Sequence, residues 1–234
     1  MKKRVLFSLL FFLMLFNGKA QKEFDVTLYP GRSLNEQIAD SIQYVFSNFL
    51  EGIISTKSDG PVKAMLNFNR LSGEFQFLDK NKMRLSFANP ENVNDIILNG
   101  RRFVYLNNLF YEEIKSGEVS LLSIPRIKIL TKGDNVGYGQ KSQTSSVRRV
   151  TRIDSDNGFY YISKEQDVAI IDETMFFLRK GRKVKEIVGC NTFKRIFEKN
   201  DAQSIDLFVK ENVVDFKNER DLVRLLIFCN GMSK

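Results

Sequence analysis

A series of short segments with alternating apolar and polar residues constrains the fold of this chain more than any other feature. The segments lie between residues 62 and 122 and read VKAMLNFN, EFQFLD, MRLSFA, DIILNG, RRFVYL and LFYEEI. A period of two is typical of strands that bury one face and expose the other. Because only short, turn-rich stretches separate these segments, we expect one antiparallel β-meander.

The turns of this meander are marked by residues that favour left-handed or tight backbone conformations. Asn99-Gly100 is the strongest signal, because a two-residue type I′ turn needs a positive φ at both positions. Ser72-Gly73, Lys80-Asn81 and Asn107-Asn108 are expected to form other turns. A later hairpin is expected where TMFFLR and KVKEIV flank Lys180-Gly181.

Two segments precede the meander. In the first, residues 21–32, the stretch DVTLY is expected to add a short strand. In the second, apolar residues at helical spacing and a capping box at Ser33 and Glu36 predict a helix over residues 34–47. The alternative is that YVFSNFLEGIIST is already a strand, because its second half is rich in β-forming residues.

Helical spacing returns after residue 190 and predicts three short amphipathic helices. Ser204 and Asn218 are expected to cap the second and third helices, and Asn230-Gly231 to end the third. Helices of this length are marginal alone, so we expect them to dock on the β region.

Together these patterns predict an α+β fold, mostly an antiparallel β-meander that curls into a half-barrel or sandwich, with a short helical C-terminal region. The expected divisions are a signal peptide at 1–20 and an N-terminal arm and helix at 21–48. An antiparallel β domain follows at 49–190, with a polar loop at 132–146. A docked helical appendage completes the chain at 191–234.

The first twenty residues have the organisation of a secretory signal peptide. A basic stretch at residues 2–4 precedes an apolar run over residues 5–16, and Ala20 is a small residue at the expected cleavage position. The apolar run is shorter than the roughly 20 residues that span a bilayer. We therefore expect cleavage between Ala20 and Gln21 and an exported, soluble protein.

The composition excludes several kinds of chemistry. The chain has no histidine, which excludes Ser-His-Asp and Cys-His catalysis and nearly all common zinc sites. Of its 36 basic residues four lie in the signal peptide, which leaves 32 against 28 acidic residues. This mildly basic balance suits an anionic envelope surface rather than nucleic acid. We expect no enzymatic activity, no metal and no cofactor.

The two cysteines, Cys190 and Cys229, allow two interpretations. In an oxidising compartment they would form a disulfide that closes a loop of about 39 residues and contributes about 3 kcal/mol. Alternatively, they are two buried thiols that pack as small apolar side chains. The sequence leaves both open, because it does not give the distance between the Cα atoms.

A polar loop and a pair of arginines are the candidate binding elements. The loop at 132–146 is long and rich in Gly, Ser, Thr and Gln, and such loops are often functional. Its candidate binding residues are Tyr138, Gly139, Ser142 and Thr144. Arg101 and Arg102 are candidates for contact with anionic lipid or glycan. The alternative is that these arginines lie on solvated strand faces.

Two further patterns fail as catalytic or metal sites. Asp154 and Asp156 resemble the start of a calcium loop, but Lys164 stands where the closing glutamate is required. Glu112 and Glu113 are adjacent, and adjacent strand residues point to opposite faces. They therefore do not form the carboxylate pair of a glycosidase.

Five short motifs follow one another between residues 46 and 230. They are Phe-x-x-Gly at 49–52, Leu-Asn-Phe-Asn at 66–69, Glu-Phe-x-Phe at 74–77, Gly-Arg-x-Phe at 100–103 and Tyr-Gly-x-x-Ser-x-Thr at 138–144. In this order they resemble a group of uncharacterised exported proteins of Gram-negative bacteria, with Phe68 in place of a tyrosine and Phe75 in place of a methionine. The resemblance implies a periplasmic or outer-membrane-associated location, but no function.

Two functional classes remain. The first is a non-enzymatic cell-envelope binding protein that uses the sheet edge, the polar loop or the tail to contact an envelope protein or an anionic envelope surface. The second is a periplasmic carrier in which a curved, phenylalanine-lined sheet holds a lipid or acyl chain. The 21 phenylalanines of the chain serve either a packed core or such a cavity.

Overall fold

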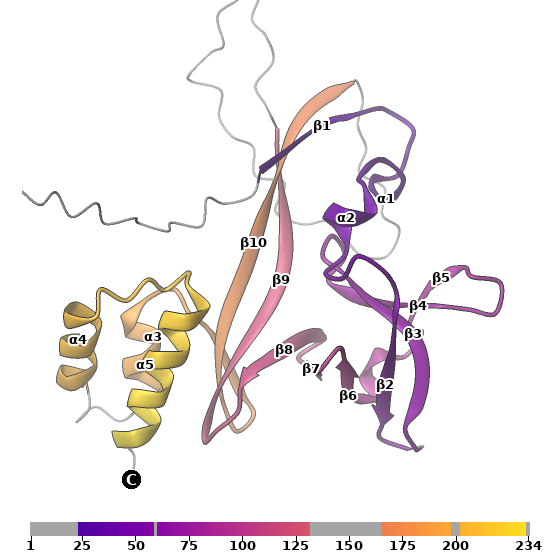
Figure 1. Ribbon diagram of the computed structural model, residues 1–234. Coiled ribbons are helices and arrows are strands. Elements are labelled where there is room, and N and C mark those ends of the chain that lie inside the picture. The colour runs from indigo at the N-terminus through magenta and orange to yellow at the C-terminus, as the bar shows by residue number, and fades with distance from the viewer. Residues whose placement is uncertain (1–22, 59, 132–164, 198–201, 233–234) are drawn as a thin grey trace, which may run out of the picture.

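The computed structural model describes residues 23–58, 60–131, 165–197 and 202–232 (Figure 1). Eleven strands of this part form one open antiparallel sheet, and short helices follow it. This confirms the α+β class and the meander-like sheet. The expected signal peptide and the candidate residues Tyr138, Gly139, Ser142 and Thr144 lie outside the described residues.

Eleven strands and five α-helices are assigned in the described ranges. The strands are β1 (Glu23–Leu28), β2 (Leu50–Thr56), β3 (Val62–Asn69), β4 (Glu74–Leu78), β5 (Arg84–Ser86), β6 (Val93–Leu98), β7 (Arg101–Leu106), β8 (Leu109–Lys115), β9 (Val119–Thr131), β10 (Gln166–Lys180) and β11 (Lys183–Glu186). The helices are α1 (Leu34–Gln37), α2 (Asp40–Gln43), α3 (Cys190–Ile196), α4 (Ala202–Glu211) and α5 (Glu219–Met232), and a 3-10 turn, η1, spans Pro90–Asn92.

The strand order departs from a simple meander at β2. The order is β1-β10-β9-β8-β7-β6-β2-β3-β4-β5, with β11 beside β10. Strands β3 to β5 form one meander and β6 to β10 another, and β2 joins them because it pairs with both β3 and β6. Strands β5 and β6 are therefore not neighbours, which the sequence analysis did not predict.

The long hairpin of β9 and β10 runs through the middle of the molecule (Figure 1). Its two strands pair over 13 consecutive residue pairs. Strand β1 pairs with the first part of β10, and β11 with its end. Strand β8 pairs with β9 only as far as Ser123. Pro125 lies just beyond this point. Among the described strands it has a partner only on the side of β10, so its lack of an N–H is tolerated as at a sheet edge.

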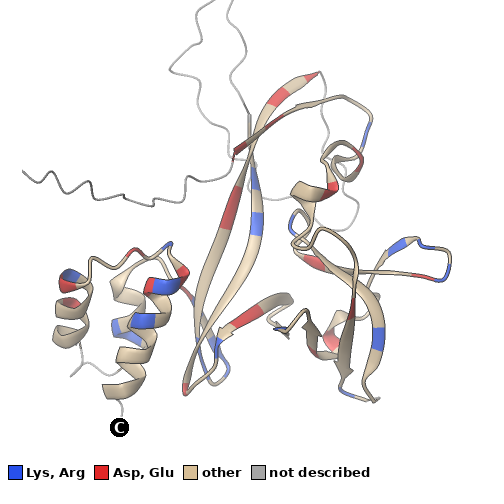
Figure 2. Cartoon of the chain, viewed as in Figure 1, with Lys and Arg blue, Asp and Glu red and all other residues tan. Residues whose placement is uncertain are grey.

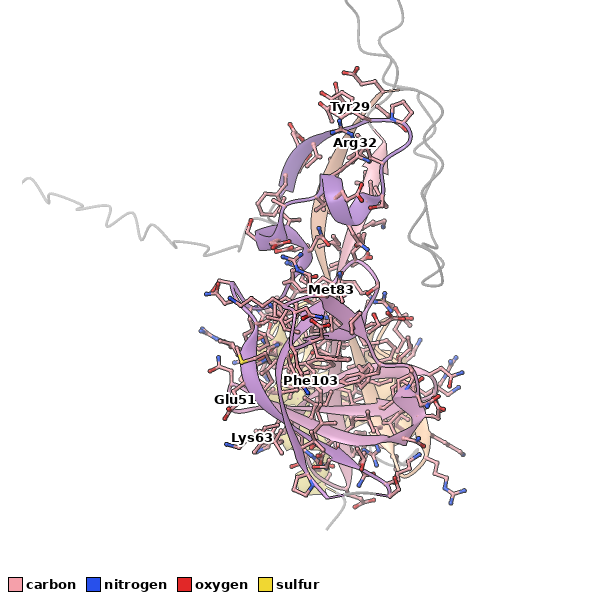
Figure 3. The ribbon with its side chains drawn as sticks, turned by 90° about the vertical axis from the view of Figure 1, so that its right-hand side faces the viewer. Tyr29, Arg32, Glu51, Lys63, Met83 and Phe103 are labelled. Atoms are coloured by element: carbon pink, nitrogen blue, oxygen red, sulfur yellow. The ribbon has the colours of Figure 1, made fainter. Side chains whose placement is uncertain are left out.

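Phenylalanines from distant strands meet inside the curled part of the sheet. The ring centroid of Phe75 in β4 lies 4.9 Å from that of Phe103 in β7 and 5.2 Å from that of Phe110 in β8. Phe68 in β3 also lies 5.2 Å from Phe75. All four side chains are at most 3% exposed, and Figure 3 shows Phe103 among the crowded side chains of the curled strands. This contact between the rings is that of a packed core and does not favour the carrier alternative.

The helix predicted over residues 34–47 is interrupted and shorter than expected. Helix α1 ends at Gln37, Ile38 and Ala39 are extended, and α2 runs only to Gln43. The buried side-chain amide of Gln43 donates to the backbone oxygens of Asn35 and Ile38, so it replaces bonds that a continuous helix would make. The prediction of one helix is wrong, and the alternative strand begins at Leu50 as β2.

The apolar spacing in this segment was nevertheless informative. Leu34, Ile38 and Ile42 are at most 7% exposed and pack with Ile129 of β9 and Ile170 of β10. The interrupted helices therefore cover one part of the long hairpin.

The C-terminal helices cover the other part of the hairpin, as expected. Leu121 of β9 and Leu178 of β10 share a buried cluster with Phe193 of α3 and with Leu222 and Leu226 of α5. This buried apolar surface stabilises helices that are too short to persist alone.

The predicted helix ends are partly right. The side-chain oxygen of Asn218 accepts a hydrogen bond from the N–H of Arg220 at 2.9 Å, so the cap of α5 is confirmed. Ser204 is not a cap, because α4 already begins at Ala202. Helix α5 also continues through the predicted stop to Met232.

Candidate functional site

Arg101, one of the two predicted anion-binding residues in the described part, is held by a carboxylate. Its guanidinium donates two hydrogen bonds to Glu112 on the neighbouring strand. It also lies 5.3 Å from the ring centroid of Phe46 and 5.5 Å from that of Phe103. A guanidinium in this position stabilises the end of the phenylalanine core.

Arg102 points to the other face of the sheet and is also paired. It donates to Asp95 at 2.9 and 3.1 Å and to Glu113 at 2.8 Å. These hydrogen bonds raise the pKa of Arg102 above its usual value. Both arginines therefore lie on strand faces, as the alternative expects, but each is paired with carboxylates of neighbouring strands, which was not predicted. Their contact with anionic lipid or glycan stays a prediction.

No disulfide joins Cys190 and Cys229 in the structure. The thiol of Cys190 donates a hydrogen bond to Asp206 at 3.3 Å, and Lys194 pairs with the same carboxylate. Burial, together with this hydrogen bond, raises the pKa of the Cys190 thiol to about 11, which disfavours a nucleophilic thiolate. Cys229 is fully buried. Cys229 is therefore buried as the second interpretation expects, whereas Cys190 is only partly buried and hydrogen-bonded.

Two features are absent from the described ranges: a metal-binding cluster and a membrane-spanning helix. No group of three or more Cys, Asp or Glu side chains there could hold a metal ion. No helix within these ranges is long and apolar enough to cross a membrane.

The hairpin of β10 and β11 carries a concentrated positive charge. Five of the seven residues from 179 to 185 are basic. The strand register places one more lysine, at the end of β8, beside them. We call these residues the basic end: Lys115, Arg179, Lys180, Arg182, Lys183 and Lys185. Figure 2 shows basic residues around the turn that follows β10.

The predicted hairpin is present, with its turn at Gly181-Arg182, one residue later than expected, and this turn explains why the charges are crowded. Gly181 has a φ of +59° and joins the facing residues Lys180 and Lys183 in a two-residue turn. Like charges directly opposite one another in a sheet reduce stability. A pair that costs stability at an exposed tip suggests a role in binding.

The strand register places four lysines of the basic end on one face. Lys185 is paired with Leu178, and Lys180 lies two residues beyond Leu178 and opposite Lys183. Cross-strand partners share a face, as do residues two apart in a strand. Leu178 packs against the C-terminal helices, so these lysines lie beside the helices at the end of that face.

A β-bulge brings Lys115 to the same face. The register between β8 and β9 shifts between Glu113 and Lys115, so that Lys115 rather than Ile114 stands opposite Leu121. Leu121 is in turn paired with Leu178. Bulges commonly redirect a side chain at the end of a sheet. Here the bulge adds a fourth lysine to the row.

The positive charges of the basic end are largely uncompensated. Lys180 pairs with Glu118 at 3.2 Å, and this is the one ion pair at the basic end between residues that the structure describes. Glu118 and Glu186 are the acidic residues of these turns, against six basic ones. Arg182, Lys183 and Lys185 are exposed. The basic end therefore presents a positive surface to solvent.

The sequence pattern of this stretch predicts a hairpin, and no site was expected there. The run RKGRKVK was visible in the sequence, and it could have identified the charge. The common face of the four lysines depends on the strand register and on the bulge, which the sequence did not predict.

The chain has no match among models of protein families, among curated proteins or among solved structures. The geometry of the basic end is therefore the basis on which a function can be proposed.

Proposed function

We propose that this protein is an exported, non-enzymatic binding protein of the cell envelope and that its basic end attaches it to an anionic surface there. One observation carries the proposal: four lysines share one face of the sheet end, and one of them has a carboxylate partner among the described residues. The signal-peptide pattern of residues 1–20 supports the envelope location.

Lysines suit a surface of mobile anionic groups. Each is a compact charge on a flexible stem and imposes no fixed ligand geometry, in contrast to a bidentate arginine. Basic residues close to an anionic membrane contribute about 1 kcal/mol each, and the attraction decays within a Debye length of about 10 Å at 0.1 M salt. Attachment through the basic end is therefore expected to be strong at low salt and weak at high salt.

Sedimentation of the purified protein with lipid vesicles tests this proposal. We expect binding to phosphatidylglycerol vesicles at about 50 mM salt, loss of binding at about 500 mM salt, and no binding to phosphatidylcholine. The double variant Lys183→Glu, Lys185→Glu should lower the affinity at least about tenfold.

A matched double variant distinguishes an effect of the basic end from an effect of the total charge of the protein. Lys57→Glu with Lys217→Glu makes the same change in total charge at two exposed positions outside the basic end, and it should lower the affinity by less than about threefold. Equal losses in the two double variants would contradict a localised site. Absence of binding to phosphatidylglycerol at low salt would contradict attachment to an anionic lipid surface.

A further inference from the structure

Strand β5 is the last strand on one side of the sheet. It pairs with β4, and no other described strand lies beside it. All three of its residues are exposed. Figure 1 shows the β4–β5 hairpin projecting to the right, away from the end of β10 at the bottom of the view. A second surface, separate from the basic end, is therefore available here.

The register of the hairpin shows which backbone groups of β5 are free. The N–H of Asp79 donates to the carbonyl of Met83 at 3.0 Å, so these two residues form a hydrogen-bonded pair. Such pairs alternate along antiparallel strands, so Phe77 and Leu85 form the next one. The N–H and C=O groups of Arg84 and Ser86 consequently point away from β4 and form the edge of the sheet.

An apolar band lies beside this edge. Met83, Leu85 and Phe87 alternate along the chain and lie on the face of Phe77, the partner of Leu85. Met83 is 54% exposed and Leu85 40% exposed. The rings of Phe77 and Phe87 stack with centroids 5.7 Å apart, and Phe87 lies 6.3 Å from Phe110 of the core. The band therefore runs from an exposed tip into the core.

Hydrogen bonds and an ion pair fix the conformation of β5 in the unbound protein. The carboxylate of Asp79 accepts hydrogen bonds from the N–H groups of Asn81 and Met83 at 2.8 and 2.7 Å and fixes the turn. On the opposite face of β5, Arg84 donates to both oxygens of Asp40 at 2.8 and 2.5 Å. A preorganised edge lowers the entropy that binding must overcome.

The charge at the tip selects among partners. Lys80 and Lys82 are exposed at the turn, and none of the ion pairs found between described residues includes either of them. Their charges disfavour pairing of β5 with a second copy of itself, because lysines at an edge repel. They favour a partner that places an acidic residue beside the tip.

We infer that β5 accepts an extended segment of a partner protein as an additional strand. The segment bonds to the outward backbone groups of Arg84 and Ser86, and apolar side chains at every second position cover Met83 and Leu85. An acidic residue of the segment lies against the lysines of the turn. This inference is independent of the basic end, since a different part of the chain carries it.

Amide hydrogen exchange of the purified protein tests the inference with a defined set of peptides. The probes are nine-residue peptides in which glutamate alternates with valine, leucine, isoleucine or phenylalanine. At saturation, exchange at the N–H groups of Arg84 and Ser86 should slow at least about tenfold, because they become bonded. Exchange at Leu85, already bonded to β4, should not change. Peptides methylated at alternate backbone nitrogens should not bind.

Two substitutions separate strand addition from other kinds of contact. Ser86→Pro removes an outward N–H without removing a bond to β4, and Leu85→Lys places a charge in the apolar band. Each should lower peptide affinity at least about tenfold while the amide spectrum of the rest of the protein is retained. Ile53→Lys, at an exposed residue of β2 that is 40% accessible, should leave the affinity unchanged.

Four results would overturn the inference: no peptide of the set binding below about 1 mM, equal binding of the methylated peptides, unchanged affinity of Ser86→Pro, or protection of Arg84 and Ser86 by phosphatidylglycerol vesicles in place of peptide. The last result would identify the hairpin as a membrane contact.

Discussion

Arg101 and Glu112 form a two-point ion pair between β7 and β8 at the end of the phenylalanine core. The side chain of Glu112 is 9% exposed, whereas that of Arg101 is 34% exposed. Glu112 stands directly opposite Phe103 across the strands, so its charge is placed against apolar rings. The guanidinium of Arg101 therefore compensates a carboxylate that has little access to water.

Replacement of Arg101 by methionine should lower the free energy of unfolding by about 3 kcal/mol, because it leaves Glu112 buried without its partner. Lys63→Met is the control. The side chains of Lys63 and of its partner Glu51 are 68% and 64% exposed, so the loss of this pair should cost at most about 1 kcal/mol. Urea unfolding measures both. Equal costs would contradict a special role for Arg101, and Arg101→Met with Glu112→Leu should recover most of the loss.

Gly73, in the turn between β3 and β4, has a φ of +77°, and a Cβ there would lie 2.2 Å from the guanidinium carbon of Arg126. That guanidinium also donates to the carbonyl of Ser72 at 3.0 Å. Gly73→Ala should therefore lower the free energy of unfolding by about 2–3 kcal/mol, from backbone strain and displacement of Arg126. Gly181 has a φ of +59°, but the space around it is open. Gly181→Ala should therefore lower the free energy of unfolding by only about 1 kcal/mol. Thermal or urea unfolding that gives equal costs would contradict the contact with Arg126.

The strands that could be predicted from the sequence are those with one wet face. In β4 and β7 the inward and outward residues differ, and glycine or asparagine marks the turns. Asn99 and Gly100 have φ values of 50° and 73°, as the hairpin prediction requires. In β10, by contrast, Phe176, Phe177 and Leu178 are all buried, because the phenylalanine core covers one face of the strand and the C-terminal helices cover the other. Alternation then disappears, and with it the sequence signal.

The remaining structure could not be predicted from the sequence, because it depends on pairing between distant segments. The place of β2 between β3 and β6 depends on contacts between segments far apart in the chain, which local patterns do not specify. The same limit applies to the basic end: its charges can be read from the sequence, but the common face of Lys115 and Lys185 follows from a bulge. The ion pairs of Arg101 and Arg102 could not be predicted for the same reason, since their carboxylate partners lie on other strands.

Asn67 should be a stabilising residue although it is polar. Its side chain is 1% exposed and donates to the carbonyls of Phe46 and Asn48 at 2.8 and 3.0 Å, while it accepts from the N–H of Phe46 at 3.2 Å. Asn67→Ala leaves these buried groups unpaired and should lower the free energy of unfolding by about 2–3 kcal/mol.

Asn67→Leu is the test of mechanism, because it keeps the volume and removes the hydrogen bonds. It should be no more stable than Asn67→Ala in urea unfolding. Asn94→Ala, at an exposed position of β6, should change stability by less than about 0.5 kcal/mol. Recovery of stability in Asn67→Leu would show that filling space, and not hydrogen bonding, is what this position requires.

The thiol of Cys190 should react slowly at neutral pH. Burial is the largest cause of its raised pKa of about 11, and the hydrogen bond to Asp206 is the second. Because folding holds this thiol protonated, its contribution to stability is complete below its ordinary pKa of 9.0 and is lost as the pH rises towards about 11.

Alkylation of the native protein by iodoacetamide, followed by mass spectrometry, measures this directly. The rate at Cys190 should stay low at pH 8 and rise towards about pH 11, while fully buried Cys229 stays unlabelled. Asp206→Asn removes the charge of the carboxylate and leaves a neutral amide oxygen as the acceptor for the thiol, so the rise should move to lower pH. Two results would contradict the role of this carboxylate. One is an alkylation rate that already rises near pH 9 in the unmodified protein, and the other is a rise at the same pH in Asp206→Asn. Complete resistance to labelling after unfolding without reductant would show instead that the two cysteines form a disulfide.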